Sequence, residues 1–284
     1  MRQTGLALFL GTLLFGGCDI VSDPVRPSSN GGGPVVEGIP RRVLLEDLTG
    51  HRCNNCPRAA RVAHELVDIY GEELVVVGVH MINGFAAPLQ PIGDDLFDTD
   101  FRTPAGSTYE STFQVMGLPL GMFNRTSYNN SRTISDGAWS EAMAVMAGQE
   151  ADLDIQFTAF NFDAGSNTVQ GQIRVPVVHD ITGDHDLVIY LTEDHVIDWQ
   201  IDAEATPSNV ENYEHRHVLR AALNGTWGEP IITGSATVGD TLTATFSYAL
   251  PSNVLVPNNC ALIAYVAQRD TYEVKQVTER KFQP

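Results

Sequence analysis

The pair Cys53-Asn54-Asn55-Cys56 stands between a segment typical of a β-strand and a segment typical of an α-helix, and this context restricts the fold more than any other feature. Residues 43–45 are apolar, and from residue 53 to residue 70 apolar side chains recur at helical spacing. Residues 74–79 form a nearly continuous β-branched run, typical of a strand buried on both faces. Strand, helix and strand in this order predict parallel pairing in an α/β layer.

The position of the pair at the start of a helix predicts its chemistry. The free N–H groups and the positive dipole end of the helix would point at the sulfur of Cys53 and stabilise its thiolate, which is the nucleophilic form. Two intervening residues let one helical turn bring the sulfurs together, so that Cys56 can attack a mixed disulfide made by Cys53. We therefore predict Cys53 as the nucleophile and Cys56 as the resolving thiol of a disulfide couple.

A second segment, residues 113–119 (FQVMGLP), precedes a predicted strand that ends at residue 123. Its aromatic residue, its β-branched residue two positions later, its glycine and its final proline resemble the cis-proline loop of thioredoxin-like proteins. The resemblance implies a cis peptide bond before Pro119, which costs little for an X–Pro bond. It also implies that Pro119 lies opposite the Cys pair and that this loop offers backbone groups to an extended peptide. Cys53, Cys56 and Pro119 are thus the expected catalytic residues.

The two motifs together resemble a thioredoxin-like domain over residues 41–149. Two departures accompany the resemblance: Gly50-His51-Arg52 precedes the pair without a tryptophan, and the separation between Cys53 and Pro119 exceeds that of a minimal thioredoxin core. Residues 83–112 are accordingly predicted to form an insertion over the rim of the domain.

Residues 150–284 follow a different pattern, in which apolar and polar residues alternate between turns rich in Gly, Asn and Asp. This pattern predicts an antiparallel β-sandwich domain, so that the chain as a whole is α+β. Residues 198–239 are the exception, and we expect a long loop there. Cys260 lies in an apolar run and is predicted to be a buried, inert thiol.

The N-terminal residues have the three parts of a secretory signal: Arg2, an apolar run over residues 6–15, and small residues just before Cys18. We predict a signal peptide at residues 1–17 and lipid attachment at Cys18. Residues 18–40 are rich in Pro, Gly and Ser and are expected to form a flexible tether. The chain is then held at a membrane by its lipid anchor without spanning the membrane.

The composition limits the partners. The chain has a net charge of −18, with 35 acidic and 17 basic residues. This balance argues against nucleic acid as a partner, because phosphate binding requires a basic footprint. After the signal peptide, no segment approaches the roughly 20 apolar residues of a membrane-spanning helix. We predict no cofactor and no resident metal.

Three groups of residues leave alternatives open. His51 and His80 could complete a zinc site with the Cys pair, although a lone CxxC is a weak zinc signal. His215 and His217, beside Glu214, could bind a metal, but hydrogen bonds to a neighbouring loop are the favoured interpretation. A last group in one turn could bind calcium, but a solvated turn is favoured. That group is Asp180, Asp184 and Asp186.

A closer resemblance covers most of the chain. The phrase VLLEDLTGHRCNNCPRA at residues 43–59 is similar to the outer-membrane-protein-28-related lipoproteins of Gram-negative envelopes. The likeness continues at residues 121–125 (GMFNR), 215–220 (HRHVLR) and 225–228 (GTWG). It implies a thioredoxin-like domain, followed by a β-rich domain, held at the outer membrane on its periplasmic face or at the cell surface.

Two functions remain open from the sequence. The first is a thiol–disulfide oxidoreductase that acts on envelope proteins or peptides through Cys53 and Cys56. The second is a non-catalytic surface binding or assembly module in which the same disulfide only stabilises the fold, as extracytoplasmic disulfides usually do.

Overall fold

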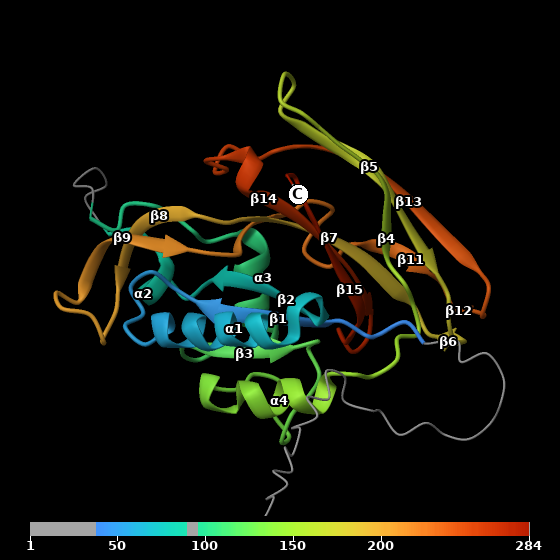
Figure 1. Cartoon of the computed structure of the whole chain (residues 1–284), viewed down its shortest axis with the longest axis horizontal. Coiled ribbons are helices and arrows are strands. Elements are labelled where there is room, and N and C mark those ends of the chain that lie inside the picture. The colour runs from blue at the N-terminus through green and yellow to red at the C-terminus, as the bar shows by residue number, and fades with distance from the viewer. Residues whose placement is uncertain (1–37, 90–95, 284) are drawn as a thin grey trace, which may run out of the picture. The chain divides into compact units, whose positions relative to one another are not determined.

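The structure is a computed structural model that describes residues 38–89 and 96–283 (Figure 1). The predicted signal peptide, Cys18 and nearly all of the predicted tether lie outside the described residues. From Gly38 to Pro284 the chain forms one compact unit. Within the described ranges, no helix combines the length and the apolar character that crossing a bilayer requires.

The helices are short and few beside the strands. In chain order, the helices and 3₁₀ helices are α1 (Cys56–Tyr70), η1 (Gly71–Glu73), α2 (Asn83–Ala86), α3 (Pro104–Thr112), η2 (Asp136–Ala138), α4 (Trp139–Met146) and η3 (Pro257–Asn259). The strands are β1 (Val43–Thr49), β2 (Leu74–His80), β3 (Leu120–Phe123), β4 (Gln156–Asp163), β5 (Thr168–Pro176), β6 (Ile181–Thr182), β7 (His185–Glu193), β8 (Val196–Ile201), β9 (Asn209–His215), β10 (Val218–Ala222), β11 (Glu229–Ile232), β12 (Ser235–Ala236), β13 (Thr241–Ala249), β14 (Cys260–Gln268) and β15 (Val274–Lys281). The fold is thus mixed α+β, with most regular structure in several sheets.

The main sheet has the strand order β15-β14-β7-β10-β2-β1-β3, and β11 also pairs with β7. β1 and β2 are parallel, in register from Val43 opposite Leu74 to Thr49 opposite His80, which confirms the predicted parallel pairing. β3 runs antiparallel to β1 on its other side. β1 is therefore the middle strand of three, parallel to β2 and antiparallel to β3.

Strands from both predicted regions share this sheet. β7, β10, β14 and β15 come from residues 150–284, and β10 meets β2 in parallel where Val218 pairs with Gly78. The backbone N–H of Gly78 also donates to the carbonyl of His217, at 2.8 Å. The predicted boundary between residues 149 and 150 stays a prediction, but the sheet is continuous across it.

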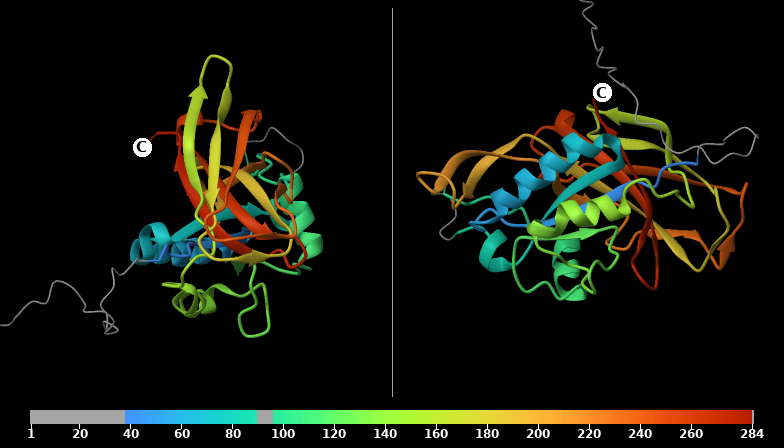
Figure 2. Two further views of the ribbon diagram at one scale, coloured as in Figure 1. Left: turned by 90° about the vertical axis from the view of Figure 1, so that its right-hand side faces the viewer. Right: turned by 60° about the horizontal axis from the view of Figure 1, so that its bottom comes forward.

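Successive residues of each strand contact different cores, because side chains alternate between the two faces of a sheet. On one face, Leu44 and Leu48 of β1 share an apolar cluster with Tyr190 and Tyr265 of β7 and β14. On the opposite face, α1 and α4 cover β1 and β2, and lie side by side there (Figure 2). On that same opposite face, the antiparallel sheet β13-β5-β4 packs on β7 and β14.

The long loop expected within residues 198–239 is wrong, because this region contains most of β8 and all of β9 to β12. β9 has the sequence NVENYEH, and most of its residues are exposed or only partly buried. Such a strand has no apolar alternation for a sequence pattern to detect. β8 and β9 pair antiparallel and form the β8–β9 hairpin, residues 196–215.

A fully buried ion pair crosses the core beneath β1. The guanidinium of Arg125 binds Glu46 through two hydrogen bonds, of 2.7 and 2.8 Å, and the two side chains are 1% and 0% exposed. The same guanidinium donates to the hydroxyls of Tyr190 and Tyr265, each at 2.9 Å. It also lies 4.6 Å from the centre of the Tyr109 ring. The pair joins β1 and the turn after β3 to β7, β14 and α3.

Gly121 of β3 lies against the indole of Trp139, the first residue of α4. A Cβ added at Gly121 would come within 2.7 Å of three indole atoms. The indole cannot retreat easily, because it is fully buried and donates a hydrogen bond of 3.1 Å to the carbonyl of Ile134. We therefore expect Gly121→Ala to lower the free energy of unfolding by about 1–3 kcal/mol, the usual cost of overpacking a core. Urea unfolding of the two proteins measures the difference, and equal midpoints would contradict this packing.

Candidate functional site

Cys53 and Cys56 are joined by a disulfide, with their Cα atoms 5.4 Å apart. The helix starts at Cys56 rather than at Cys53, and Pro57 occupies its first turn, where a missing N–H costs nothing. Residues 53–55 form a turn in which the N–H of Cys56 donates to the carbonyl of Cys53, at 3.2 Å. Each cysteine is only 1% exposed. The predicted pair is thus present, but buried.

The β8–β9 hairpin covers the turn that carries Cys53. The N–H of Ile201 donates to the carbonyl of His51 at 2.9 Å, and the N–H of Ala203 donates to the carbonyl of Asn54 at 2.8 Å. The amide of Gln200 donates to the carbonyl of Cys53 at 3.1 Å. Backbone and side-chain bonds therefore hold the hairpin over residues 51–54.

An ion pair and a second segment complete this cover. Arg61 of α1 binds Asp202 in the turn of the hairpin, at 3.0 Å. From another direction, the carbonyl of Phe85 in α2 accepts from the N–H of Arg52, at 2.9 Å. A Cβ at Gly50 would lie 2.7 Å from that same carbonyl, so only glycine fits there without a shift. Residues 50–53 therefore lie between the hairpin and α2, with Gly50, His51 and Cys53 buried.

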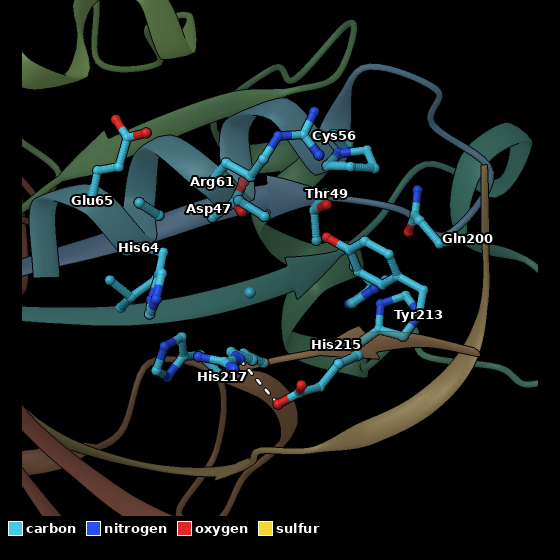
Figure 3. Close-up of a pocket in the computed structure, with 18 residues that line it drawn as sticks. Asp47, Thr49, Cys56, Arg61, His64, Glu65, Gln200, Tyr213, His215 and His217 are labelled. Atoms are coloured by element: carbon cyan, nitrogen blue, oxygen red, sulfur yellow. Dashed lines mark hydrogen bonds and ion pairs between the residues drawn. The ribbon is translucent and has the colours of Figure 1, made fainter. Parts of the chain in front are cut away.

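A cavity of about 430 Å³ lies beside Cys56, between α1, the carboxyl ends of β1 and β2, and the end of β9 (Figure 3). It is lined by Asp47, Thr49, Cys56, Pro57, Ala60, Arg61, Ala63, His64, Glu65, Val76, Gly78, His80, Gln200, Tyr213, Glu214, His215, Arg216 and His217. Cys53 is not among these lining residues. The disulfide therefore borders the cavity through Cys56.

Asp47 is the buried carboxyl of this cavity. It is 5% exposed, and among the described residues its Oδ1 has no hydrogen-bond partner. Burial, and to a smaller extent the charge of Asp136, raise the pKa of Asp47 to about 8. Burial and then the charge of Asp47 raise the pKa of Tyr213, across the cavity on β9, to about 12. Asp47 is therefore mostly protonated at neutral pH and can exchange a proton with a neighbouring group.

Two of the cavity's histidines are neutral. Burial, followed by the charges of His215 and His51, holds the pKa of His80 well below its usual range. Burial lowers the pKa of His215 to about 4, and its Nε2 lies 3.3 Å from the carbonyl of Trp199. The His80 ring stacks on Phe101 with its centroid 4.8 Å away, and the His215 ring is tilted against Phe101 at 4.9 Å. These imidazoles serve as neutral polar walls.

In the structure, several side chains considered as metal ligands have other partners. The sulfurs that would bind zinc with His51 and His80 are bonded to each other. Glu214 pairs with His195 at 2.6 Å and with Arg216 at 3.1 Å, instead of joining His215 and His217 in a ligand set. Within the described residues, no group of three or more His, Cys, Asp or Glu side chains is arranged to hold a metal ion.

The remaining residues singled out in the sequence lie elsewhere. Asp184 and Asp186 bind Arg269, at 2.9 and 2.6 Å, and Asp180 accepts from the backbone N–H of Val238. Cys260 is a free, buried thiol, as predicted, and burial raises its pKa to about 12.

Pro119 follows a cis peptide bond, as the sequence resemblance implies. Leu120, the next residue, pairs with Leu48 of β1. Pro119 therefore lies at the end of the sheet where the chain leaves β1 for Cys53, although it does not line the cavity.

Asp47, Gln200 and Tyr213 are site residues that the sequence analysis missed. Asp47 had a detectable signal, because a carboxyl inside an apolar strand is rarely buried without a purpose. Gln200 and Tyr213 had none, since their segment has no regular pattern.

The family assignment comes from residues 106–284, which match the family model described as outer membrane protein Omp28. A mixed α+β protein with a buried CxxC disulfide is the class that the fold and site define. Since the match covers more than half of the sequence, the chain belongs to the Omp28 family. This confirms the resemblance and the predicted outer-membrane location. The matched residues begin after Cys56, so the chemistry of the Cys pair has to be argued from its geometry.

One solved structure has a similar fold, and a second match is weaker. HBP35 of Porphyromonas gingivalis has a TM-score of 0.61 and 14% identity, over 86% of this chain and 76% of its own. A domain of the outer membrane lipoprotein Omp28 from Porphyromonas gingivalis is 21% identical, over 47% of this chain and 90% of that domain, with a TM-score of 0.30. No curated protein sequence matches the chain.

Proposed function

We propose that this chain is a lipoprotein, anchored in the outer membrane through Cys18, that exchanges disulfides with envelope proteins through the Cys53–Cys56 couple. The observation that carries the proposal is a disulfide at the start of α1 whose Cys56 lines a cavity with the buried Asp47. The Oδ1 atom of Asp47 has no hydrogen-bond partner in the part of the chain that the structure describes. Perturbed, buried carboxyls beside a reactive group are typical of functional sites.

The strand arrangement supports a thioredoxin-like origin for residues 41–149. β1 lies between a parallel strand, β2, and an antiparallel strand, β3, and the Cys pair follows β1 directly. Pro119 enters β3 at the same end of the sheet. α1 and α4 pack on one face of these strands. In support of the proposal, the disulfide and Pro119 both lie toward the end of the sheet where β1 finishes.

The proposed chemistry uses the two cysteines and the carboxyl of Asp47. In the reduced protein, the Cys53 thiolate attacks a partner disulfide and releases one partner thiolate, which leaves a mixed disulfide. The Cys56 thiol gives its proton to the ionised form of Asp47. The resulting thiolate attacks the sulfur of Cys53, reforms the intramolecular disulfide and releases the second partner thiolate. The partner is reduced by two electrons and the Cys pair is oxidised by two.

One observation favours a second function, in which the disulfide only stabilises a binding or assembly module. Both cysteines are 1% exposed, and the β8–β9 hairpin is bonded over Cys53. A protein partner can reach Cys53 only after the hairpin moves.

The reduction potential separates the two functions. We expect the full chain, equilibrated with dithiothreitol buffers, to have a potential of roughly −120 to −270 mV, the range of exchange enzymes. We also expect Cys56→Ser to accumulate mixed disulfides with envelope proteins through Cys53. The matched control is Cys53→Ser/Cys56→Ser, which should trap none. A potential below about −300 mV together with an empty trap would establish the structural disulfide instead.

A further inference from the structure

We propose that the cavity beside Cys56 is a binding site for a low-molecular-mass thiol, of amino-acid or short-peptide size, which reduces the disulfide by attack on Cys56. The inference deepens the proposed exchange function and rests on it. It names the class of electron donor and the sulfur at which the donor reacts.

Cys53 and Cys56 are equally buried, at 1% exposure each, but they have different neighbours. The carbonyls of His51, Cys53 and Asn54 are all bonded to the β8–β9 hairpin, which closes that side of the disulfide. Cys56 lines the cavity, whereas Cys53 does not. A volume of about 430 Å³ is that of a small-molecule site. A folded protein cannot enter it, so this approach to the disulfide selects for small donors.

The cavity contains a carboxyl group that could accept a hydrogen bond from a thiol. Buried polar atoms nearly always have a hydrogen-bond partner, so an orphan indicates a missing one. Among the described residues, Oδ1 of Asp47 is such an orphan, and Asp47 lines the cavity with Cys56. In Figure 3, Asp47 lies on β1 below α1, and Tyr213 reaches toward it from β9. An S–H group in the cavity would have Asp47 as its acceptor.

The lining also carries both signs of charge, which suits a zwitterionic thiol. Arg61 and Arg216 are cations and Glu65 and Glu214 are anions, contributed by α1 and by the end of the β8–β9 hairpin. Arg61 and Arg216 each have side chains 45% exposed, so they meet solvent as well as the cavity. Arg61 already pairs with Asp202, and Arg216 with Glu214, so the amino and carboxylate groups of a donor would join existing ion pairs at the edge of the cavity.

The reaction balances in two steps. The first donor thiol gives its proton to the ionised form of Asp47, and its sulfur bonds to the sulfur of Cys56. The bond to Cys53 breaks, and Cys53 leaves as a thiolate near the N-terminal end of α1, where negative charge is favoured. A second donor thiol releases its proton to water, and its sulfur attacks the donor sulfur of the mixed disulfide. Cys56 leaves and takes the proton from Asp47. Two donor thiols become one donor disulfide, and the protein disulfide is reduced by two electrons.

Alkylation of the reduced full chain tests which sulfur is accessible. With limiting iodoacetamide and peptide mapping by mass spectrometry, we expect Cys56 to be modified before Cys53, by about tenfold if access dominates over thiolate character. A second readout compares free cysteine with the same thiol carried on a long polyethylene glycol chain. Free cysteine should reduce the disulfide, and the polymer thiol should be at least about tenfold slower.

A plugged cavity provides the matched pair of variants. Ala60 is a partly buried lining residue of α1, and Ala60→Phe should fill the cavity and slow reduction by free cysteine about tenfold. Ile69→Phe, at a 72% exposed position of the same helix, should reduce at the wild-type rate. If Ala60→Phe does not fold, the alkylation order still decides the question.

The outcomes separate this site from the function on which it rests. Modification of Cys53 first, or equal rates for the free and the polymer thiol, would overturn the cavity as the donor site while leaving exchange intact. A disulfide that resists both thiols and also has a potential below about −300 mV would overturn exchange itself.

Discussion

Arg125→Met is expected to lower the free energy of unfolding by about 3–5 kcal/mol, the usual cost of removing one partner of a buried ion pair. The reason is that Glu46 would keep a charge in a site that is 0% exposed. Among the described residues, the Tyr190 hydroxyl would be the one side chain still donating to it, at 2.9 Å. The aromatic ring of Tyr109 would also lose its guanidinium neighbour. Urea unfolding at pH 7 under non-reducing conditions measures the loss.

The double variant Glu46→Met/Arg125→Met is the control. It removes the buried charge together with its partner, and hydrophobic replacement of a whole buried pair is often neutral. The hydroxyls of Tyr190 and Tyr265 would still bond to each other, at 2.9 Å. We therefore expect the double variant to be more stable than Arg125→Met. A double variant that is less stable than either single variant would show that the pair is net stabilising.

Asp47→Asn is expected to stabilise the protein, and the gain should grow with pH. The pKa of Asp47 is about 8 in the folded protein against 3.8 as its ordinary value. Between these two values the folded chain retains a proton that the unfolded chain has released, so raising the pH favours unfolding. At about 1.4 kcal/mol per pKa unit, the wild type loses up to roughly 5 kcal/mol between pH 4 and pH 8. Asparagine does not titrate and escapes this loss.

The measurement is urea unfolding of the oxidised wild type and of Asp47→Asn at pH 5 and pH 8. Asp68→Asn, at an exposed position of α1, is the matched control and should show no comparable gain. A difference between Asp47→Asn and wild type that is the same at both pH values would mean that Asp47 is ionised in the folded state. In that case Asp47 could not hold the proton in the proposed exchange.

The local sequence pattern was sufficient to predict the part of the fold that carries the disulfide. Residues 43–45 and 74–79 were recognisable because strands buried on both faces have continuous apolar runs, and the resulting parallel pair is present. The Cys53–Cys56 disulfide followed from spacing at a strand–helix junction. In each case the signal is confined to neighbouring residues, which a sequence displays directly.

What surrounds the disulfide depends on distant residues. The cover over Cys53 is supplied by Gln200, almost 150 positions later, from a hairpin whose polar residues lack alternation. β2 joins β10 through the pairing of Val218 with Gly78, and a pairing between such distant residues cannot be predicted from a local sequence pattern. The cavity is formed by these two long-range contacts, and so the sequence could indicate its cysteine but not its walls.

The pairing of β2 with β10 also bears on how the two halves of the chain could be separated. A polypeptide that stopped near residue 149 would lack β10, and the N–H of Gly78 would lose the carbonyl of His217. Such a fragment would present an uncapped strand edge, the usual starting point for self-association. It would also lack the hairpin that shields Cys53. The half of the chain that carries the disulfide is therefore not a transplantable module, because residues translated after it cover Cys53.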